Sequence, residues 1–252
     1  MDVVHLMLFF LLGLIFGSFF NVVGLRIPKK ESIVYPNSHC PSCQHELSWF
    51  ENIPVLSYII LKGKCRHCKT HISPIYPVVE LVTGFLYAFT FYKLGFQMEL
   101  AIGLLLASLL VIITVSDWVY MLIPNRVLLF FLVFIVGLRI VEPLDPWWDI
   151  LLGAAVGFGI LYLLAVVSKG GMGGGDIKLF FILGLFLGTK ATVMTLFLAS
   201  IIGAIFGFIQ IILKGYEKRR PIPFGPFIAI GAILAYFYTD EMINWYIEMF
   251  IY

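Results

Sequence analysis

Eight long apolar stretches, separated by short polar segments, restrict this chain to one class of fold. A helix needs about 20 mostly apolar residues to cross the hydrocarbon core of a bilayer. Only 13% of the residues are charged, whereas a soluble domain would carry about 25%. We therefore predict an all-α polytopic membrane protein with about eight transmembrane helices. The predicted spans are residues 4–25, 78–92, 100–116, 127–141, 150–168, 177–189, 191–213 and 222–238.

The chain is expected to have three parts. Residues 1–25 hold the first helix, which we expect to be retained, because its apolar part is too long for a signal peptide and carries no Ala-x-Ala-like cleavage site. Residues 26–77 form a small extramembrane loop domain. Residues 78–252 carry the remaining spans, in which Gly153-x-x-x-Gly157 and Gly203-x-x-x-Gly207 predict helix-packing faces.

Lys and Arg are distributed unevenly between the two sides of these spans. Cytoplasmic loops of membrane proteins carry an excess of Lys and Arg. One side holds only Lys93, Arg139 and Lys190. The other side holds Arg26, Lys29, Lys30, Lys62, Lys64, Arg66, Lys69, Arg126, Lys169, Lys178, Lys214, Lys218, Arg219 and Arg220. We expect both termini to lie outside the cell and the 26–77 loop to be cytoplasmic.

All four cysteines lie in that loop, as Cys40-Pro-Ser-Cys43 and Cys65-Arg-His-Cys68. Two C-x-x-C pairs separated by 21 residues indicate a zinc site. The loop is too short to build much of a core, and a metal would supply the missing folding energy. Two disulfides are the alternative, but a cytoplasmic loop keeps its thiols reduced. We predict a structural Cys₄ zinc site, with the neighbouring histidines in solvent.

Two aspartates stand where apolar stretches reach the membrane surface. Ionisable groups at membrane depth indicate a functional site. Asp117 ends one span and is followed by the helix break at Pro124-Asn125, and Asp176 begins another. Taken singly, Asp117 could be an interfacial charge and Asp176 a helix N-cap. Together they suggest an aspartyl protease dyad, in which one carboxyl is ionised and the other keeps its proton.

A glycine run precedes Asp176 and favours the catalytic interpretation. Five of the six residues from Gly170 to Gly175 are glycine, and each costs about 1 kcal/mol relative to Ala in a helix. Irregular backbone at membrane depth is tolerated where it lines a wet cavity, which hydrolysis requires. We expect Gly173, Gly174 and Gly175 to form an active-site loop with Lys178, which either keeps the Asp176 carboxylate ionised or anchors the chain at the membrane interface.

Over nearly its whole length, the chain resembles the type IV prepilin peptidases, which are GxGD-type aspartyl proteases of the membrane. A lone Gly-x-Gly-Asp is also found in presenilin-type proteases, but the ordered set of motifs is specific. The shared segments are Gly17–Pro28, the paired cysteines, Asn52–Ser57, Tyr76–Gly84, Asp117 with Pro124-Asn125, Gly173–Lys178 and Pro223–Pro226.

The resemblance implies a bifunctional enzyme in the bacterial cytoplasmic (inner) membrane. Such enzymes cut a short basic leader from type IV prepilin or pseudopilin precursors, on the cytoplasmic side, after a glycine and before a hydrophobic helix. They then N-methylate the new N-terminus with S-adenosylmethionine, and they serve pilus, protein secretion or competence systems. The family's two aspartates correspond to Asp117 and Asp176. Membrane lipids are expected contacts, and nucleic acid is not.

Three further residues have candidate roles. Glu80 either contacts the basic leader or places a negative charge at a helix N-terminus. Asn21 and Arg26 resemble family positions near the methyl-transfer region. The alternative functions are a zinc enzyme, a transporter and a non-catalytic pilus-assembly factor. The first lacks an open metal position and a His-Glu-x-x-His motif. Transporters share glycine breaks and acidic residues, but bind substrate near the midplane.

Overall fold

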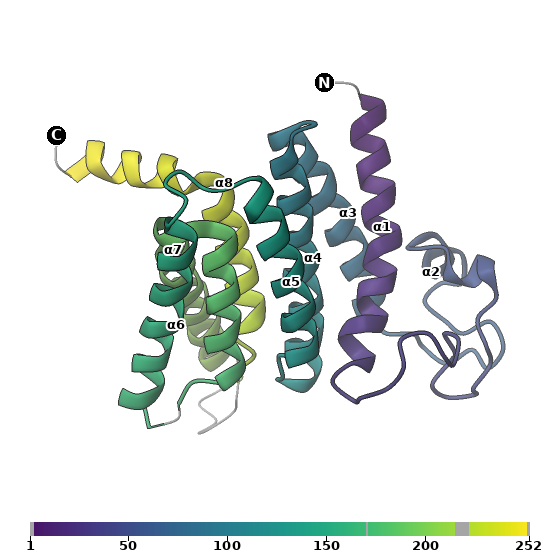
Figure 1. Ribbon diagram of the computed structural model, residues 1–252. Coiled ribbons are helices and arrows are strands. Elements are labelled where there is room, and N and C mark those ends of the chain that lie inside the picture. The colour runs from purple at the N-terminus through teal and green to yellow at the C-terminus, as the bar shows by residue number, and fades with distance from the viewer. Residues whose placement is uncertain (1–2, 170, 215–221, 251–252) are drawn as a thin grey trace. The chain divides into compact units, whose positions relative to one another are not determined.

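Helices make up nearly all the regular structure of the described chain. The computed structural model describes residues 3–169, 171–214 and 222–250 (Figure 1). Lys218, Arg219 and Arg220, which carry part of the predicted charge asymmetry, and Gly170 lie outside these ranges. The helices are α1 (Val3–Arg26), η1 (Trp49–Asn52), α2 (Leu56–Ile60), α3 (Ile75–Leu94), α4 (Met98–Tyr120), α5 (Asn125–Val141), α6 (Asp149–Val167), α7 (Gly174–Lys214) and α8 (Gly225–Phe250).

The predicted all-α membrane fold is confirmed. Among the described helices, α1, α3, α4, α6, α7 and α8 are long and apolar enough to cross a membrane. The 17 residues of α5 fall slightly short of the usual length of about 20. A single helical element, α7, covers two predicted spans, 177–189 and 191–213. Each of the eight predicted spans therefore coincides with a helix or with part of one.

The fold divides into two compact units, Met1–Val115 and Ser116–Tyr252, and the division falls inside α4. In the first unit, α1 and α3 approach each other closely at small residues. A Cβ on Gly13 would lie 2.6 Å from the carbonyl oxygen of Thr83, and a Cβ on Gly17 would lie 2.8 Å from Cα of Glu80. Small residues allow such close approach of membrane helices. Glycines thus fix how α1 and α3 pack.

In the second unit, α6 packs on the first part of α7 in the same way. A Cβ on Gly157 would lie 2.6 Å from the Phe180 carbonyl oxygen, and one on Gly153 would lie 2.8 Å from that of Gly184. The predicted packing face at Gly153 and Gly157 is therefore confirmed. Gly203 faces the ring of Phe227 in α8, and so also lies on a helix-packing surface.

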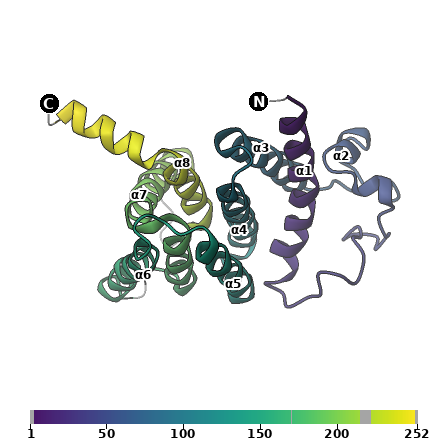
Figure 2. The same ribbon diagram turned by 45° about the horizontal axis from the view of Figure 1, so that its top comes forward.

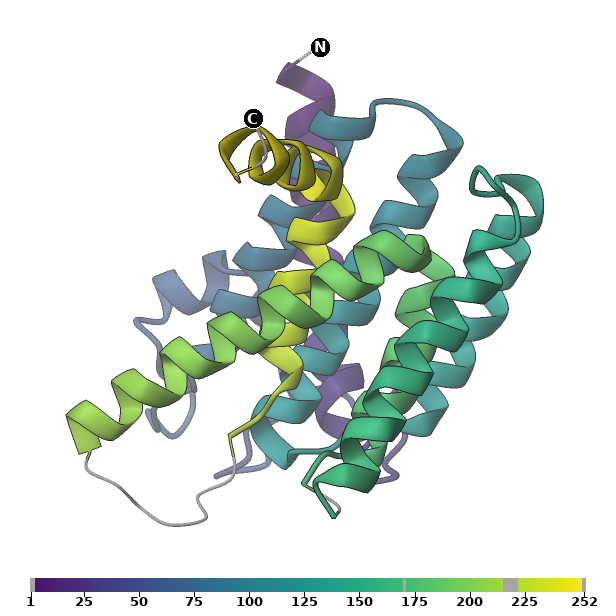
Figure 3. The ribbon, with the colours of Figure 1, turned by 90° about the vertical axis from the view of Figure 1, so that its left-hand side faces the viewer.

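A break at Gly188 divides α7 into two helical segments that run in different directions (Figure 3). Gly188 has φ 73° and ψ −177°, a conformation that is essentially restricted to glycine. The break is capped from both sides. Asp149 accepts hydrogen bonds from the Thr189 backbone N–H (3.1 Å) and hydroxyl (2.6 Å), and Arg139 donates to the Phe186 carbonyl.

Two details of the predicted topology need correction. Arg139, which was counted among the few charges on the poorly basic side of the spans, lies in the last turn of α5 and is 4% exposed, because it donates to the Phe186 carbonyl before the Gly188 break. The last predicted span ended at 238, whereas α8 continues to Phe250 and its C-terminal part projects from the rest of the unit (Figures 1 and 2). The projecting part carries exposed Trp245 and Tyr246, residue types that favour the membrane–water interface.

Candidate active site and metal centre

The four cysteine thiols converge in the first unit. Their Sγ atoms all lie within 4.8 Å of one another, with 3.8 Å between Cys40 and Cys68 and 3.9 Å between Cys43 and Cys65. Zinc–sulfur bonds of about 2.3 Å place tetrahedral sulfur ligands about 3.8 Å apart. These separations are much longer than a disulfide bond of about 2.05 Å, and all four cysteines are free. The arrangement fits a closed Cys₄ metal site.

The two cysteine pairs are held by two equivalent turns, in segments of similar sequence, Cys40–Ser48 and Cys65–Ser73. Cys40 accepts a hydrogen bond at its carbonyl from the Gln44 N–H (2.9 Å), and Cys65 accepts one from the Lys69 N–H (3.0 Å). Gln44 and Lys69 both have positive φ, 59° and 60°. Each turn therefore reverses the chain directly after its second cysteine and points two thiols at the same place.

At Cys40 and Cys68, local hydrogen bonds favour the thiolate form that binds metal, whereas burial and the neighbouring thiols raise the pKa of Cys43. The Thr70 hydroxyl and backbone N–H lower the pKa of Cys68 to about 6. Backbone N–H groups of Cys43 and Ser42 lower the pKa of Cys40. Next to the four cysteines, His45 lies 3.5 Å from the carboxylate of Glu51. Hydrogen bonds from Ser48, together with His45, lower the pKa of Glu51.

In the second unit, Asp117 lies in the last turn of α4 and is 7% exposed. Its Oδ2 accepts a hydrogen bond from the backbone N–H of Gly225 at 2.7 Å, and the Phe224 N–H also donates to this carboxyl. Both donors stand at the start of α8. A helix N-terminus is a favourable place for a negative charge. The start of α8 thus orients the Asp117 carboxyl.

Asp176 is the third residue of α7. It therefore lies inside the first helical turn rather than at the N-cap, and its carboxyl accepts a hydrogen bond from the Gly173 N–H. Gly174 and Gly175 are already helical, so the irregular backbone ends at Gly173, earlier than expected. Gly175 packs against Ile123, where an added Cβ would lie 2.8 Å from the Ile123 Cβ. Close packing and this cap explain why helix forms over glycines.

These contacts bring the two aspartates to the same end of the second unit. The last turn of α4 holds Asp117 and the first turn of α7 holds Asp176. Ile123, in the connection between α4 and α5, contacts Gly175. The two carboxyls lie close enough for the charge of Asp117 to act on Asp176. The predicted helix break is also present, because α4 ends at Tyr120 and α5 begins at Asn125.

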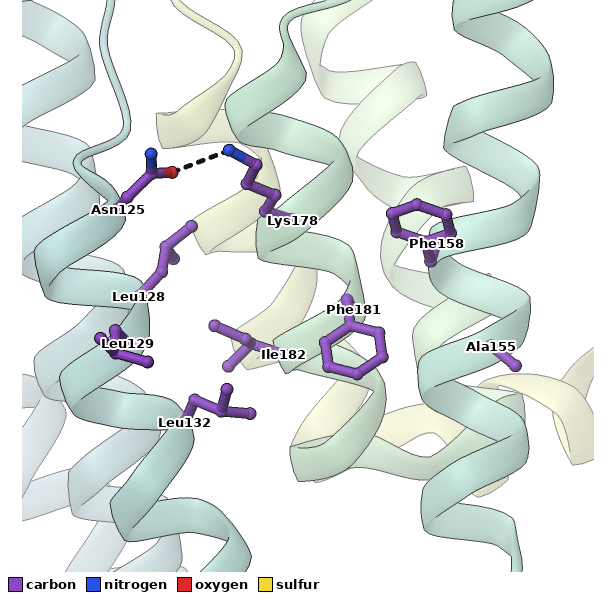
Figure 4. Close-up of a pocket in the computed structure, with 9 residues that line it drawn as sticks. All are labelled: Asn125, Leu128, Leu129, Leu132, Ala155, Phe158, Lys178, Phe181 and Ile182. Atoms are coloured by element: carbon purple, nitrogen blue, oxygen red, sulfur yellow. Dashed lines mark hydrogen bonds between the residues drawn. The ribbon is translucent and has the colours of Figure 1, made fainter.

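An apolar groove of about 590 Å³ opens in the same unit, between α5, α6 and α7 (Figure 4). At one end, Lys178 Nζ donates to Asn125 Oδ1 at 3.0 Å. Lys178 therefore pairs with an amide rather than with Asp176. The groove is lined by Asn125, Leu128, Leu129, Leu132, Ala155, Phe158, Lys178, Phe181 and Ile182.

The other predicted residues lie in the first unit. Glu80 is 8% exposed, and its Oε2 accepts a hydrogen bond from the Val55 N–H at 2.7 Å. Asn21 is 2% exposed and donates to the Tyr76 carbonyl, while its Oδ1 is buried without a partner. Arg26 binds backbone carbonyls between Ser32 and Asn37 and so holds the loop against the end of α1. In this structure Glu80 and Arg26 connect helices to the loop, and Asn21 connects α1 to the first turn of α3.

Sequence reasoning missed two parts of the site. The backbone N–H of Gly225 holds Asp117, and Asn125 holds Lys178. The Pro223–Pro226 segment and Pro124-Asn125 both belonged to the resemblance, but a backbone donor has no side-chain signature. The sequence did offer one indication of their role. Both segments begin predicted helices on the same side of the membrane as the two aspartates.

The sequence also matches known families. Residues 11–94 match the Bacterial Peptidase A24 N-terminal domain, and residues 104–208 match the Type IV leader peptidase family. A Bacillus subtilis (strain 168) protein, the prepilin leader peptidase/N-methyltransferase, is 46% identical over 244 residues, covering 97% of this chain and 98% of the relative. The chain belongs to the type IV leader peptidase family. The first matched region contains the four cysteines and the second contains both aspartates.

Other members of the type IV leader peptidase family are more distant. Proteins of the same name from Aeromonas salmonicida and Pseudomonas aeruginosa are each 35% identical over 271 residues. The matches cover 96% and 94% of this chain, and 93% and 92% of the relatives. No solved structure matches the chain.

Proposed function

We propose that this protein is an aspartic prepilin peptidase that cuts the leader from type IV pilin-like precursors. The observation that carries the proposal is the pair Asp117 and Asp176. They are brought together at the ends of membrane helices, each with its own backbone donor. The relatives' shared name, prepilin leader peptidase/N-methyltransferase, supports the choice of substrate.

In the proposed mechanism, one aspartate carboxylate removes a proton from the attacking water. The second carboxyl, protonated, donates a hydrogen bond to the scissile carbonyl and then a proton to the leaving amine. Two neighbouring carboxyls do not readily ionise together, which keeps one of them protonated. The pair titrates as a unit, so the two roles belong to the pair. The Gly225 and Gly173 N–H groups hold the two carboxyls in place.

We further propose that both aspartates face the cytoplasm. The excess of Lys and Arg on their side of the spans supports this orientation. A basic leader would then approach two acidic side chains. The apolar groove between α5, α6 and α7 of the same unit is suited to the hydrophobic part of the precursor that stays in the membrane.

The four cysteines are proposed to hold one structural Zn²⁺, because four thiolates close the coordination shell and leave no position for substrate. The bound metal would supply folding energy to a loop with little core. N-methylation with S-adenosylmethionine is proposed from the relatives' name alone. The apolar groove does not fit this donor, because its one cation, Lys178, would repel a sulfonium. No residue is assigned to the donor.

The test is co-expression with a type IV prepilin, followed by mass spectrometry of the pilin N-terminus. A peptidase gives a pilin that lacks its leader, and methyl transfer adds one methyl group to the new N-terminus. A precursor that keeps its leader in the presence of folded protein would refute the peptidase. A cleaved but unmethylated pilin would refute methyl transfer alone.

The same assay separates the two alternative functions. A transporter or a non-catalytic assembly factor would leave the precursor uncut. A non-catalytic assembly factor would also tolerate Asp117→Asn and Asp176→Asn, since that role needs no acid–base pair. Cleavage that depends on both carboxyls excludes both alternatives.

A further inference from the structure

The loop domain carries an apolar surface that the predicted function does not use. Its short helix α2 has no buried residue. Leu56, Ile59 and Ile60 are 50%, 64% and 68% exposed, and they follow an i, i+3, i+4 pattern that places them on one face. Just before α2, Trp49 is 80% exposed. We infer that this surface, formed by Trp49, Leu56, Ile59 and Ile60, lies in the lipid bilayer.

The first argument is depth. The N–H of Val55, directly before α2, donates to Glu80 Oε2 at 2.7 Å. Glu80 is the sixth residue of α3, which places it about 8 Å inside the start of that helix. In Figures 1 and 3, α2 lies level with the C-terminal half of α1, not beyond its end. Because α1 and α3 are both long and apolar enough to span a membrane, α2 stands at membrane depth.

The second argument is the direction of the two faces of α2. The Tyr58 hydroxyl donates to the Ile72 carbonyl, and Tyr58 also packs on Gly63. Tyr58 therefore turns toward the cysteine turns. The Leu56, Ile59 and Ile60 face points away from the protein, where its surroundings at this depth are lipid.

The third argument is backbone hydrogen bonding. Lipid offers no partner to backbone N–H groups, so segments exposed to it must satisfy them internally. Eight N–H groups of the α2 segment find partners within the segment or on Glu80. The donors are Val55, Leu56, Ser57, Ile59, Leu61, Lys62, Gly63 and Lys64.

The flanking residues fit the edge of a bilayer. Trp is enriched at the membrane–water interface. Lys62 and Lys64 follow α2 where the chain returns to the cysteine turns, and long basic side chains extend toward the headgroups. Positive charge next to an apolar helix complements anionic phospholipids. The surface therefore anchors the cysteine loop in the lipid, rather than leaving it in solution as its place between two spans suggests.

The test is photocrosslinking in nanodiscs of phosphatidylethanolamine and phosphatidylglycerol. p-Benzoylphenylalanine is placed at Ile60, at Phe85 and at Glu46. Phe85 is 64% exposed on α3 and serves as the lipid-facing reference. Glu46 is an exposed residue of the first cysteine turn. All three side chains are exposed, so the variants are expected to fold, which an unchanged unfolding temperature would verify.

Mass spectrometry then measures the yield of lipid adducts. The inference predicts a yield at Ile60 close to that at Phe85 and several-fold above that at Glu46. A yield at Ile60 as low as that at Glu46 would overturn it. Adducts at Ile60 with a protein partner in place of lipid would also overturn it and would identify the surface as a protein-docking site.

Discussion

Replacing Gly188 with alanine should destabilise the second unit, because two effects act at this position. An alanine would have to adopt a conformation with φ 73° and ψ −177°, which costs about 1–3 kcal/mol. Its Cβ would also collide with Asp149 Oδ2, the oxygen that accepts from the Thr189 N–H. Displacing this cap costs about 1 kcal/mol.

The two effects together predict a loss of about 3 kcal/mol, taking the middle of the strain range. For a chain of this length, a loss of about 3 kcal/mol lowers the unfolding temperature by about 6–12 °C. Thermal unfolding of the purified protein in detergent measures this shift. Gly159→Ala is the matched control, since Gly159 also lies in a membrane helix but has open space around its Cβ position. An unfolding temperature for Gly188→Ala equal to that of Gly159→Ala would refute the claim that the helix break at Gly188 requires glycine and the Asp149 cap.

Three further changes have defined outcomes. Cys65→Ser should reduce bound zinc, measured by atomic absorption, from about one per chain to a small fraction, since the Cys₄ shell needs every ligand; undiminished zinc would place the metal elsewhere. Glu80→Leu should lower the free energy of unfolding by about 1–3 kcal/mol, because it leaves the Val55 N–H unpaired. Glu80→Gln keeps an oxygen acceptor and should cost less. Equal losses for the two variants would contradict the hydrogen bond between Val55 and Glu80. Leu129→Trp should fill part of the groove and raise the KM for a prepilin at unchanged unfolding temperature, and an unchanged KM would show that substrate does not use the groove.

Patterns along the chain were enough to predict the helices. Runs of apolar residues predicted every span, and the spacing of Gly153 and Gly157 predicted a packing face, because membrane helices depend on local composition and small residues. The same reasoning could also have found Gly13 and Gly17, which have the same spacing in α1.

Features that depend on tertiary contacts were beyond the sequence. Gly174 and Gly175 are poor helix formers, yet they are helical because Ile123 packs on Gly175 and the Gly173 N–H is used by Asp176. A loop argument based on propensity alone could not include that packing. Arg139 was counted only as a charge on one side of the spans, since the carbonyl it binds is contributed by α7, far along the chain.

The candidate sites show the same contrast between local sequence patterns and tertiary contacts. The spacing of the paired cysteines was enough to predict a four-thiol site, and the structure brings the four thiols together as expected. Asp117 depends on Gly225, which is 108 residues away and contributes only a backbone N–H. The sequence identified the chemistry of this carboxyl but not the group that orients it.

The most direct test of the central claim is the rate of leader cleavage by Asp117→Asn and Asp176→Asn, measured with purified protein and a type IV prepilin. Asparagine keeps an oxygen to accept the Gly225 or Gly173 N–H, so unfolding temperatures should stay close to that of the unchanged protein. Because general acid–base catalysis contributes about 10²–10⁴-fold, each variant should cleave at least about 10²-fold more slowly. Near-normal cleavage by either folded variant would contradict the dyad.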